Sequence, residues 1–330
     1  MLILAKSILG LMLGFFIAVI FGFFLIPVLR KLKCKQSISA FTAFKHASKN
    51  GTPTLGGLIF IVPTLVNMIF IYLSDRLEIT HNLLIIIFVF ISYALLGFVD
   101  DYLKIKEKNN AGLSIPQKLL VQVLIALVFF YIYMKGGGDA NVTITSLGIN
   151  IDMGWFYGLF ILFLLVGSSN AVNLTDGLDG LAGGLSLVAF LSFGIITWGT
   201  TWVEGYQEIA IFCFILVGAI LGFLVYNTHP AKIFMGDTGS LSLGATLAAI
   251  AILTKHELSL AVIGGVFVME ALSSIIQLIA IKKFHTKVFL MTPIHHHFEK
   301  LGWEETDIVK LFLIIGFMLG MIAIYYGVWM

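Results

Sequence analysis

The segment QEIAIFCFILVGAILGFLVY, residues 207–226, decides the fold class of this chain. It contains one charged residue, Glu208, and it is long enough to cross a bilayer as a helix, which takes about 20 mainly apolar residues. Similar apolar runs occur along the rest of the chain. The ten predicted spans cover residues 7–29, 54–74, 82–99, 118–134, 153–171, 181–200, 207–226, 241–254, 258–281 and 308–329.

The composition agrees with this interpretation, because 59% of the 330 residues are apolar and only 12% are charged. Soluble domains are about 45–50% apolar and about 25% charged, so a soluble enzyme is excluded. A disordered chain is excluded because it would need low hydrophobicity. We therefore predict one all-α polytopic membrane domain over residues 1–330, with about ten transmembrane helices. The run 241–254 is short for a span, so we expect it to be either tilted or surrounded by protein.

Several other kinds of site are not indicated. The two cysteines, Cys34 and Cys213, lie far apart, which argues against a disulfide framework or a zinc site. The net charge is +2 and there is no basic domain with a recognisable motif, so we expect no nucleic-acid partner. The first apolar run is too long for the core of a signal peptide and should remain in the mature protein.

The distribution of positive charge predicts the orientation in the bilayer. Lysine and arginine gather in one set of loops, residues 30–53, 100–117, 172–180, 227–240 and 282–307. Positive residues stay on the cytoplasmic side, so these loops are predicted to be cytoplasmic and both termini to lie outside. The outer segment 139–152 alternates apolar and polar residues before Gly148, which predicts a small periplasmic β-hairpin.

Acidic residues gather in three of the predicted cytoplasmic loops. Asp100 and Asp101 end the third span, and two adjacent carboxylates repel each other unless they share a cation. In the segment 173–181, Asp176 and Asp179 are spaced so that one helical turn would place both on one side. Asp237 lies in a glycine-rich turn before a span, where a metal that holds phosphate could bind. Taken alone, the second and third motifs could also be helix caps, and the first could be a helix end in which Asp100 pairs with Lys104.

Two further loops carry basic or titratable side chains. The segment 292–299 contains the consecutive residues His295, His296 and His297, which cannot all face one way on a helix. Such a cluster indicates phosphate contact, proton transfer or metal binding. The segment 49–57 combines Lys49 with hydroxyls and glycines, which suits a phosphate, although a basic loop against anionic lipid heads has the same composition.

All these clusters belong to the same predicted membrane face. Carboxylates together with water and substrate phosphates form a typical Mg²⁺ site. Cations around a transferring phosphoryl group offset its developing charge. The sequence therefore predicts an enzyme site at the cytoplasmic interface, which a lipid phosphate reaches from one side and a soluble nucleotide from the other.

The segments 49–57, 100–104, 173–181, 234–240 and 293–299 resemble, in order and spacing, the motifs of the polyprenyl-phosphate N-acetylhexosamine-1-phosphate transferases. The stretch 293–299, Pro-Ile-His-His-His-Phe-Glu, is similar to the branch that uses UDP-MurNAc-pentapeptide rather than UDP-N-acetylglucosamine. The resemblance implies a Mg²⁺-dependent transfer of the phosphosugar to undecaprenyl phosphate, giving lipid I and UMP in peptidoglycan synthesis. It implies the bacterial plasma membrane as the location, and it is compatible with a homodimer.

The resemblance also assigns residue roles. Asp237 is implied as the metal ligand, Asp100 as the favoured general base, and Phe234 as a stacking partner of uracil. The implied catalytic residues are Asp100, Asp101, Asp237, His295, His296, His297 and Lys49. The implied substrate-binding residues are Thr52, Thr54, Asn173, Asp176, Gly177, Leu178, Asp179, Asn227, Phe234, Gly236 and Gln277.

Some alternatives remain open. A lipid phosphate monoester is mostly ionised at pH 7, so Asp100 could position the nucleophile or share the metal instead of removing a proton. A two-step route would make Asp237 a covalent nucleophile, but a metal-bound carboxylate is a poorer nucleophile, so we favour direct attack. A sister enzyme that uses UDP-N-acetylglucosamine is the nearest alternative. A transporter would place ionisable residues near mid-span, and Glu270 is the one acid deep within a run, with Gln277 on a similar face.

Overall fold

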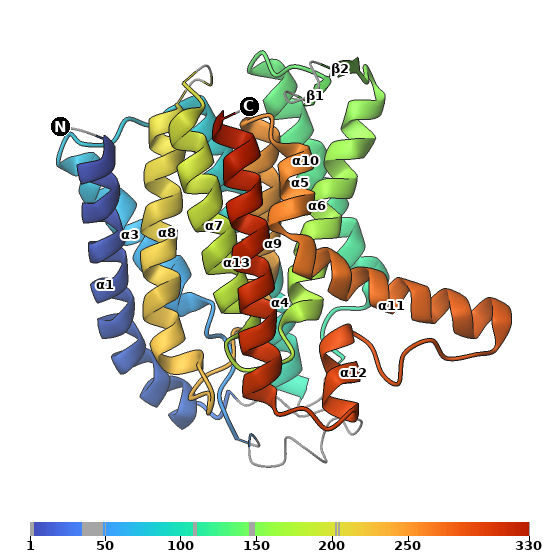
Figure 1. Ribbon diagram of the computed structural model, residues 1–330. Coiled ribbons are helices and arrows are strands. Elements are labelled where there is room, and N and C mark those ends of the chain that lie inside the picture. The colour runs from blue at the N-terminus through green and yellow to red at the C-terminus, as the bar shows by residue number, and fades with distance from the viewer. Residues whose placement is uncertain are drawn as a thin grey trace.

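A computed structural model describes residues 3–34, 49, 51–107, 111–144, 149–201, 203 and 205–329. These residues form a helical bundle with one small β-hairpin (Figure 1). The helices are α1 (Ile3–Lys31), α3 (Leu58–Leu73), α4 (His81–Glu107), α5 (Ile115–Lys135), α6 (Phe156–Thr175), α7 (Leu181–Gly199), α8 (Tyr206–Asn227), α9 (Gly236–Leu253), α10 (Glu257–Ile263), α11 (Gly265–Phe284), α12 (Ile294–Lys300) and α13 (Glu305–Trp329).

The structure confirms the predicted class of all-α polytopic membrane protein. Nine helices of the described chain are long and apolar enough to cross a membrane, and α3 is a shorter apolar helix. The predicted hairpin is also present, since β1 (Asn141–Ile144) pairs antiparallel with β2 (Ile149–Asp152). Both termini and the hairpin lie at the same end of the bundle, and α12 lies at the opposite end (Figure 1). We refer to the end with α12 as the α12 end.

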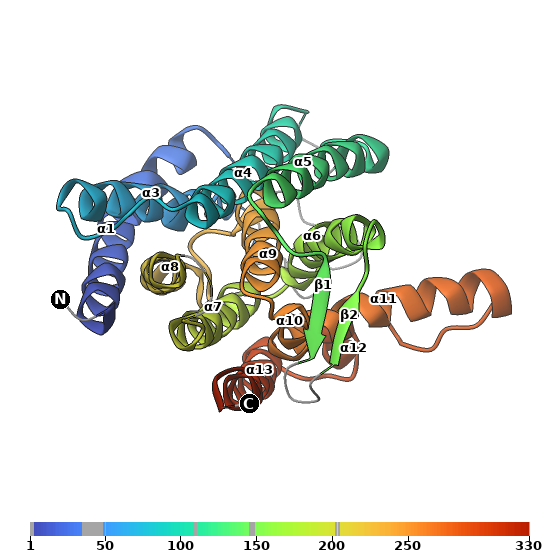
Figure 2. The same cartoon turned by 90° about the horizontal axis from the view of Figure 1, so that it is seen from above.

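Helix α9 forms the centre of the bundle, with α4 and α6 against it (Figure 2). Each of its residues is buried, although several are hydroxyl residues. Two of these hydroxyls donate to backbone carbonyls, Ser242 Oγ to Phe90 O at 2.8 Å and Ser240 Oγ to Gly236 O at 3.1 Å. Such small polar residues let neighbouring helices approach closely in a membrane. Of the two explanations for this short apolar run, the structure therefore supports enclosure by protein.

The predicted span 258–281 is wrong as a single helix. It divides between α10 and α11 at Gly264 and Gly265, and α11 projects sideways from the bundle (Figure 1). Two adjacent glycines make the change of direction cheap, because neither residue has a Cβ to clash with the turning backbone. Apolar periodicity could not reveal the break, since α11 is itself long and apolar enough to span a membrane.

Candidate active site

The site begins where α4 and α9 approach each other most closely. A Cβ on Gly97 would lie 2.1 Å from the carbonyl oxygen of Asp237, so only glycine fits between these two helices. Asp100 and Asp101 follow Gly97 by about one helical turn. The close packing therefore brings both carboxylates to the first turn of α9, where Asp237 lies.

Asp101 holds the beginning of α9 in place. Its Oδ1 accepts the backbone N–H of Asp237 at 3.1 Å. Its Oδ2 accepts the N–H of Thr238 at 3.0 Å and the hydroxyl of Thr238 at 2.7 Å. The first N–H groups of a helix have no partner within the helix, so a carboxylate is a suitable acceptor there. Asp101 is 3% exposed, and its hydrogen bonds hold the backbone of Asp237 in position.

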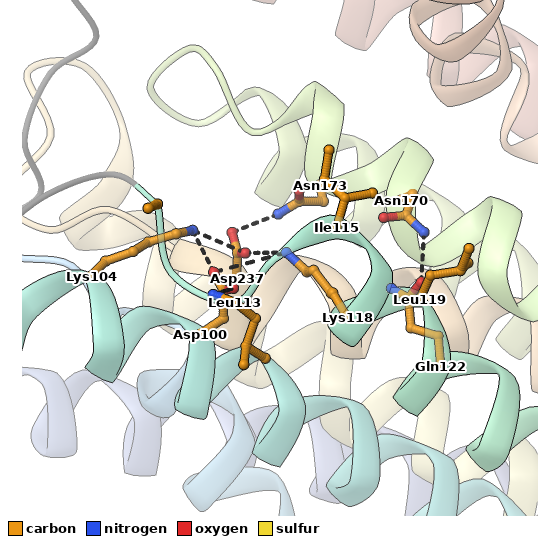
Figure 3. A pocket seen from close by; sticks show the side chains of 11 residues that line it. Asp100, Lys104, Leu113, Ile115, Lys118, Leu119, Gln122, Asn170, Asn173 and Asp237 are labelled. Carbon is orange, nitrogen blue, oxygen red and sulfur yellow. Dashed lines mark hydrogen bonds and ion pairs between the residues drawn. The ribbon is translucent and has the colours of Figure 1, made fainter.

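Asp100 and Asp237 share two lysines (Figure 3). Lys104 Nζ lies 2.6 Å from Asp100 Oδ2 and 3.1 Å from Asp237 Oδ2. Lys118 Nζ lies 3.9 Å from the same oxygen of Asp100 and also forms an ion pair with Asp237. The carboxylates of Asp100, Asp101 and Asp237 each offer an oxygen, and these atoms lie within 4.8 Å of one another. The arrangement can hold one cation or a phosphate group between acids and lysines.

Local sequence explains why Lys118 reaches the site from α5. Ser114 precedes the helix, and its backbone N–H donates to the Gln117 side chain at 3.0 Å, which is half of a capping box. This cap places Lys118 in the first turn. The preceding loop also folds over Asp100, whose Oδ1 accepts the N–H of Leu113 at 2.9 Å.

A cavity of about 430 Å³ opens beside the two lysines (Figure 3). Its wall from α6 includes Asn173, whose Nδ2 donates to Asp237 Oδ1 and to Ser240 Oγ, each at 2.8 Å. Farther along the cavity, Asn170 Nδ2 donates to Gln122 Oε1 at 3.0 Å. The cavity therefore has charged groups at one end and amides at the other. It is lined by Asp100, Lys104, Ala111, Leu113, Ile115, Lys118, Leu119, Gln122, Asn170, Asn173 and Asp237.

The segment 176–179 joins this centre to a second acidic cluster. The pKa of Asp176 is raised to about 7, chiefly by burial and then by the charges of Asp237 and Asp101, while a hydrogen bond from the Gly236 backbone acts to lower it. Asp179 has other partners, and its Oδ1 lies 2.8 Å from Lys49 Nζ. Asp176 therefore borders the first cluster, and Asp179 belongs to the second.

The second cluster contains two residues that the sequence did not indicate. Glu305 Oε1 lies 2.6 Å from Lys49 Nζ and accepts the backbone N–H of Asp179 at 2.6 Å. His229 Nδ1 lies 3.0 Å from Asp179 Oδ2 and 3.5 Å from Glu305 Oε2. Glu305 thus ties the beginning of α13 to the segment 176–179.

The three consecutive histidines have three different partners, which confirms that they do not face one way. His295 Nδ1 lies 3.0 Å from Glu270 Oε2, and His296 Nδ1 lies 2.6 Å from Glu299 Oε2. His297 Nδ1 accepts the backbone N–H of Leu290 at 3.1 Å. The motif meets the segment 176–179 through Gly177, because a Cβ on that glycine would lie 2.3 Å from His295 Nε2.

The segments 52–57 and 233–236 lie side by side. Phe234 N donates to Pro53 O at 2.9 Å, and Gly56 N donates to Phe234 O at 2.8 Å. Gly236 has a φ of +73°, and a Cβ there would lie 2.5 Å from Asp101 Oδ2 and 2.7 Å from Thr54 Oγ1. This pairing fixes the turn before Asp237 and leaves the Phe234 ring half-buried next to it.

Two predicted substrate-binding amides make hydrogen bonds within the protein. Asn227 Oδ1 accepts Gly180 N at 3.1 Å, and its Nδ2 donates to Ile233 O at 2.9 Å. Gln277 Oε1 accepts the N–H groups of Val288 and Phe289, each at 3.0 Å. Both amides hold loops at the α12 end. Thr52 and Leu178 lie in the segments just described, half-buried and buried respectively, and their predicted contacts with substrate stay predictions.

Comparison with known proteins identifies the family. A family model described as glycosyl transferase family 4 matches residues 83–255. A phospho-N-acetylmuramoyl-pentapeptide-transferase of Halalkalibacterium halodurans is 48% identical over 97% of each chain, and those of Bacillus licheniformis and Bacillus subtilis are 45% identical over 97% of each chain. The chain belongs to the phospho-N-acetylmuramoyl-pentapeptide-transferase family. The family resemblance predicted from the loop motifs is thus confirmed.

Four charged side chains at the site were not among the site residues predicted from the sequence. They are Lys104, Lys118, His229 and Glu305. Lys104 had a signal, since it is four residues after Asp100 and would pair with it on a helix. Lys118, His229 and Glu305 had none, because their partners lie 18 to 256 positions away in the chain and not within a helical turn. These side chains reach the site only because the packing of the bundle places one end each of α5, α8 and α13 at the α12 end.

Proposed function

We propose that this protein transfers phospho-MurNAc-pentapeptide from UDP-MurNAc-pentapeptide to undecaprenyl phosphate, giving lipid I and UMP for peptidoglycan synthesis. One observation carries the proposal: Asp100, Asp101 and Asp237 converge within 4.8 Å beside two lysines, at a cavity of a membrane protein from this family. Relatives with up to 48% identity bear the name of this activity. A charged cavity of this kind suits a diphosphate, whose charge the lysines can offset.

Two of the three carboxylates, those of Asp100 and Asp237, fit a magnesium ion. Mg²⁺ takes oxygen ligands and binds through one or two carboxylates together with substrate phosphates. Asp237 would hold it together with Asp100, whereas both oxygens of Asp101 are already used by the backbone of α9. When bound, the ion would neutralise the diphosphate and make UMP a better leaving group.

The protein's own side chains then have separate tasks. Lys104 and Lys118 would bind phosphate oxygens and offset the charge of the transferred group. Asn173 holds Asp237 in one orientation. Because the lipid phosphate is mostly ionised at pH 7, Asp100 would chiefly position the attacking oxygen rather than remove a proton from it. The lipid phosphate oxygen would attack the sugar-side phosphorus directly.

The nucleoside would bind toward the second cluster. Phe234 is half-buried beside the turn that precedes Asp237, which suits stacking on uracil. Asp176, Asp179 and Lys49 lie between this turn and α13, where they can meet a uridine or its phosphates. Gly177 and Leu178 complete the same segment, and the histidine motif lies against it through Gly177.

We also propose that the α12 end faces the cytoplasm of a bacterium. The basic loops gather at that end, as positive residues do on the cytoplasmic side. Ile115 is 84% exposed at the edge of the cavity, which suits contact with a lipid tail in the bilayer. A homodimer stays a prediction.

The proposal is tested by measuring UMP release from the purified protein with undecaprenyl phosphate, Mg²⁺ and either sugar nucleotide. UDP-MurNAc-pentapeptide should be consumed. Release from UDP-N-acetylglucosamine alone would instead assign the sister activity. Asp237→Asn should abolish turnover at every Mg²⁺ concentration, whereas Asp307→Asn should not, because Asp307 is exposed and pairs only locally with Lys310. Near-normal turnover of the Asp237 variant would contradict the metal role.

A further inference from the structure

Glu270 is a carboxylic acid in an unusual place. It lies in α11, one and a half turns after the break at Gly264 and Gly265, and its side chain is 0% exposed. An unpaired carboxylate would be costly there, because a fully buried side chain has no water to solvate its charge. Intramembrane acids therefore usually have a partner and a function.

The partner is the first histidine of the motif. Glu270 Oε2 lies 3.0 Å from His295 Nδ1, and the same oxygen lies 3.5 Å from the backbone nitrogen of His295. His295 is also 0% exposed. The backbone nitrogen can only donate, so Oε2 serves as an acceptor, and Nδ1 carries the proton that faces it. The other ring nitrogen, Nε2, is buried without a hydrogen-bond partner in the described part of the chain.

A second observation shows where Nε2 is directed. The atom lies so close to Gly177 that any Cβ at this position would be 2.3 Å away. Gly177 follows Asp176 and precedes the segment that reaches Asp179 and Glu305. On the other side, the ring of His296 lies 4.1 Å from that of His295, centroid to centroid. The His295 ring is therefore confined between α11, the Gly177 turn and the next histidine.

We propose that Glu270 is a positioning residue for the transfer reaction, acting through His295: it fixes the tautomer and orientation of the ring so that Nε2 faces the Gly177 turn. The inference rests on the proposed function. For metal-binding histidines, a carboxylate that orients the imidazole through its second nitrogen matters nearly as much as the imidazole itself, and Glu270 holds His295 in the same way. Because Glu270 lies in the second turn of α11, the direction that this helix takes after the break also sets where Glu270 meets His295.

Steady-state kinetics of UMP release can test this inference. Glu270→Ala should lower kcat about 10- to 100-fold, the usual effect of losing such an orienting partner, while the KM for the uridine donor changes less than about threefold. Glu270→Gln keeps an acceptor oxygen at the same place and should recover part of kcat. Ser274→Ala is the matched control, because Ser274 is on the same helix and, among the residues that the structure describes, its hydroxyl donates only to the backbone oxygen of Glu270, at 3.4 Å.

A double-mutant cycle separates positioning from a general structural role. If Glu270 acts through His295, Glu270→Gln should cost little further activity in a His295→Gln background. Equal losses in both backgrounds, or a kcat for Glu270→Ala within twofold of the unmodified protein, would overturn the inference. Thermal unfolding of each variant in detergent identifies those that fail to fold.

A spectroscopic readout does not depend on turnover. With ¹⁵N-labelled histidine, one strongly hydrogen-bonded Nδ1 proton should be assigned to His295 by its loss in His295→Gln, and it should also disappear or shift in Glu270→Ala. An unchanged signal contradicts the contact even in active protein. If the unmodified protein releases no UMP from either donor, the proposed function fails, and this signal still reports whether Glu270 holds His295.

Discussion

Gly97→Ala should inactivate the protein without touching any charged group. The new Cβ would lie 2.1 Å from Asp237 O and 2.5 Å from Thr238 N, whereas ordinary contacts begin at 3.4 Å. The first turn of α9 would have to retreat by more than 1 Å, and it carries Asp237. Displacements of about 1 Å in a catalytic group can cost about 100-fold in rate, so we expect a loss of kcat of that order.

The cost to stability should be smaller than the loss of activity. Forcing an extra methyl group into a packed interior costs about 1–3 kcal/mol. Gly167→Ala in α6 is the matched control, because nothing lies within 4 Å of a Cβ there. That change should leave kcat unaltered and raise helix stability by about 1 kcal/mol or less.

The assay measures UMP release and the melting temperature in detergent for each of the two variants. If Gly97→Ala retains kcat within about threefold while remaining folded, the reasoning that α4–α9 contact sets the position of Asp237 is refuted. If both variants lose activity equally, the loss is not specific to the α4–α9 contact, because replacing a glycine elsewhere in the bundle has the same effect.

The remaining predictions concern the segment 176–179 and its partners. The pKa of Asp176 is raised to about 7, so the folded state binds more protons than the unfolded state between about pH 4 and 7, and stability falls as pH rises through that range. Asp176→Asn should therefore raise the free energy of unfolding at pH 8 by about 1 kcal/mol, after discounting for the partial exposure of Asp176, and should change it little at pH 4. Thermal melts at the two pH values measure this, and the opposite pH dependence would contradict the assignment. Lys49→Met should raise the KM for the uridine donor about tenfold, because Asp179 and Glu305 lose their shared cation. Unchanged donor binding by calorimetry would remove Lys49 from the nucleoside site.

The loop motifs predicted many of the residues at the candidate site, but not how they are arranged. The Asp100–Asp101 pair, Asp237 and the histidine triplet were identifiable because clustered charge is rare in so apolar a chain. The single predicted site is instead two acidic clusters, Asp100–Asp101–Asp237 and Asp179–His229–Glu305, linked by the segment 176–179. Lys104 and Lys118 pair with Asp237 in the first cluster, whereas Lys49 pairs with Asp179 in the second.

The amino-acid sequence is enough to show that the chain is a bundle of membrane helices, because long apolar runs are not stable in water and, in lipid, can satisfy their backbone hydrogen bonds as helices. Only the tertiary structure decided that α11 turns away at Gly264, that Glu270 meets His295, and that Lys118 and Glu305 join the acids. The side-chain contacts among these join residues far apart in the chain, from 25 positions for Glu270 and His295 to 256 positions for Lys49 and Glu305. Such contacts depend on how closely helices pack, and this is set by small residues such as Gly97 rather than by the charged residues themselves.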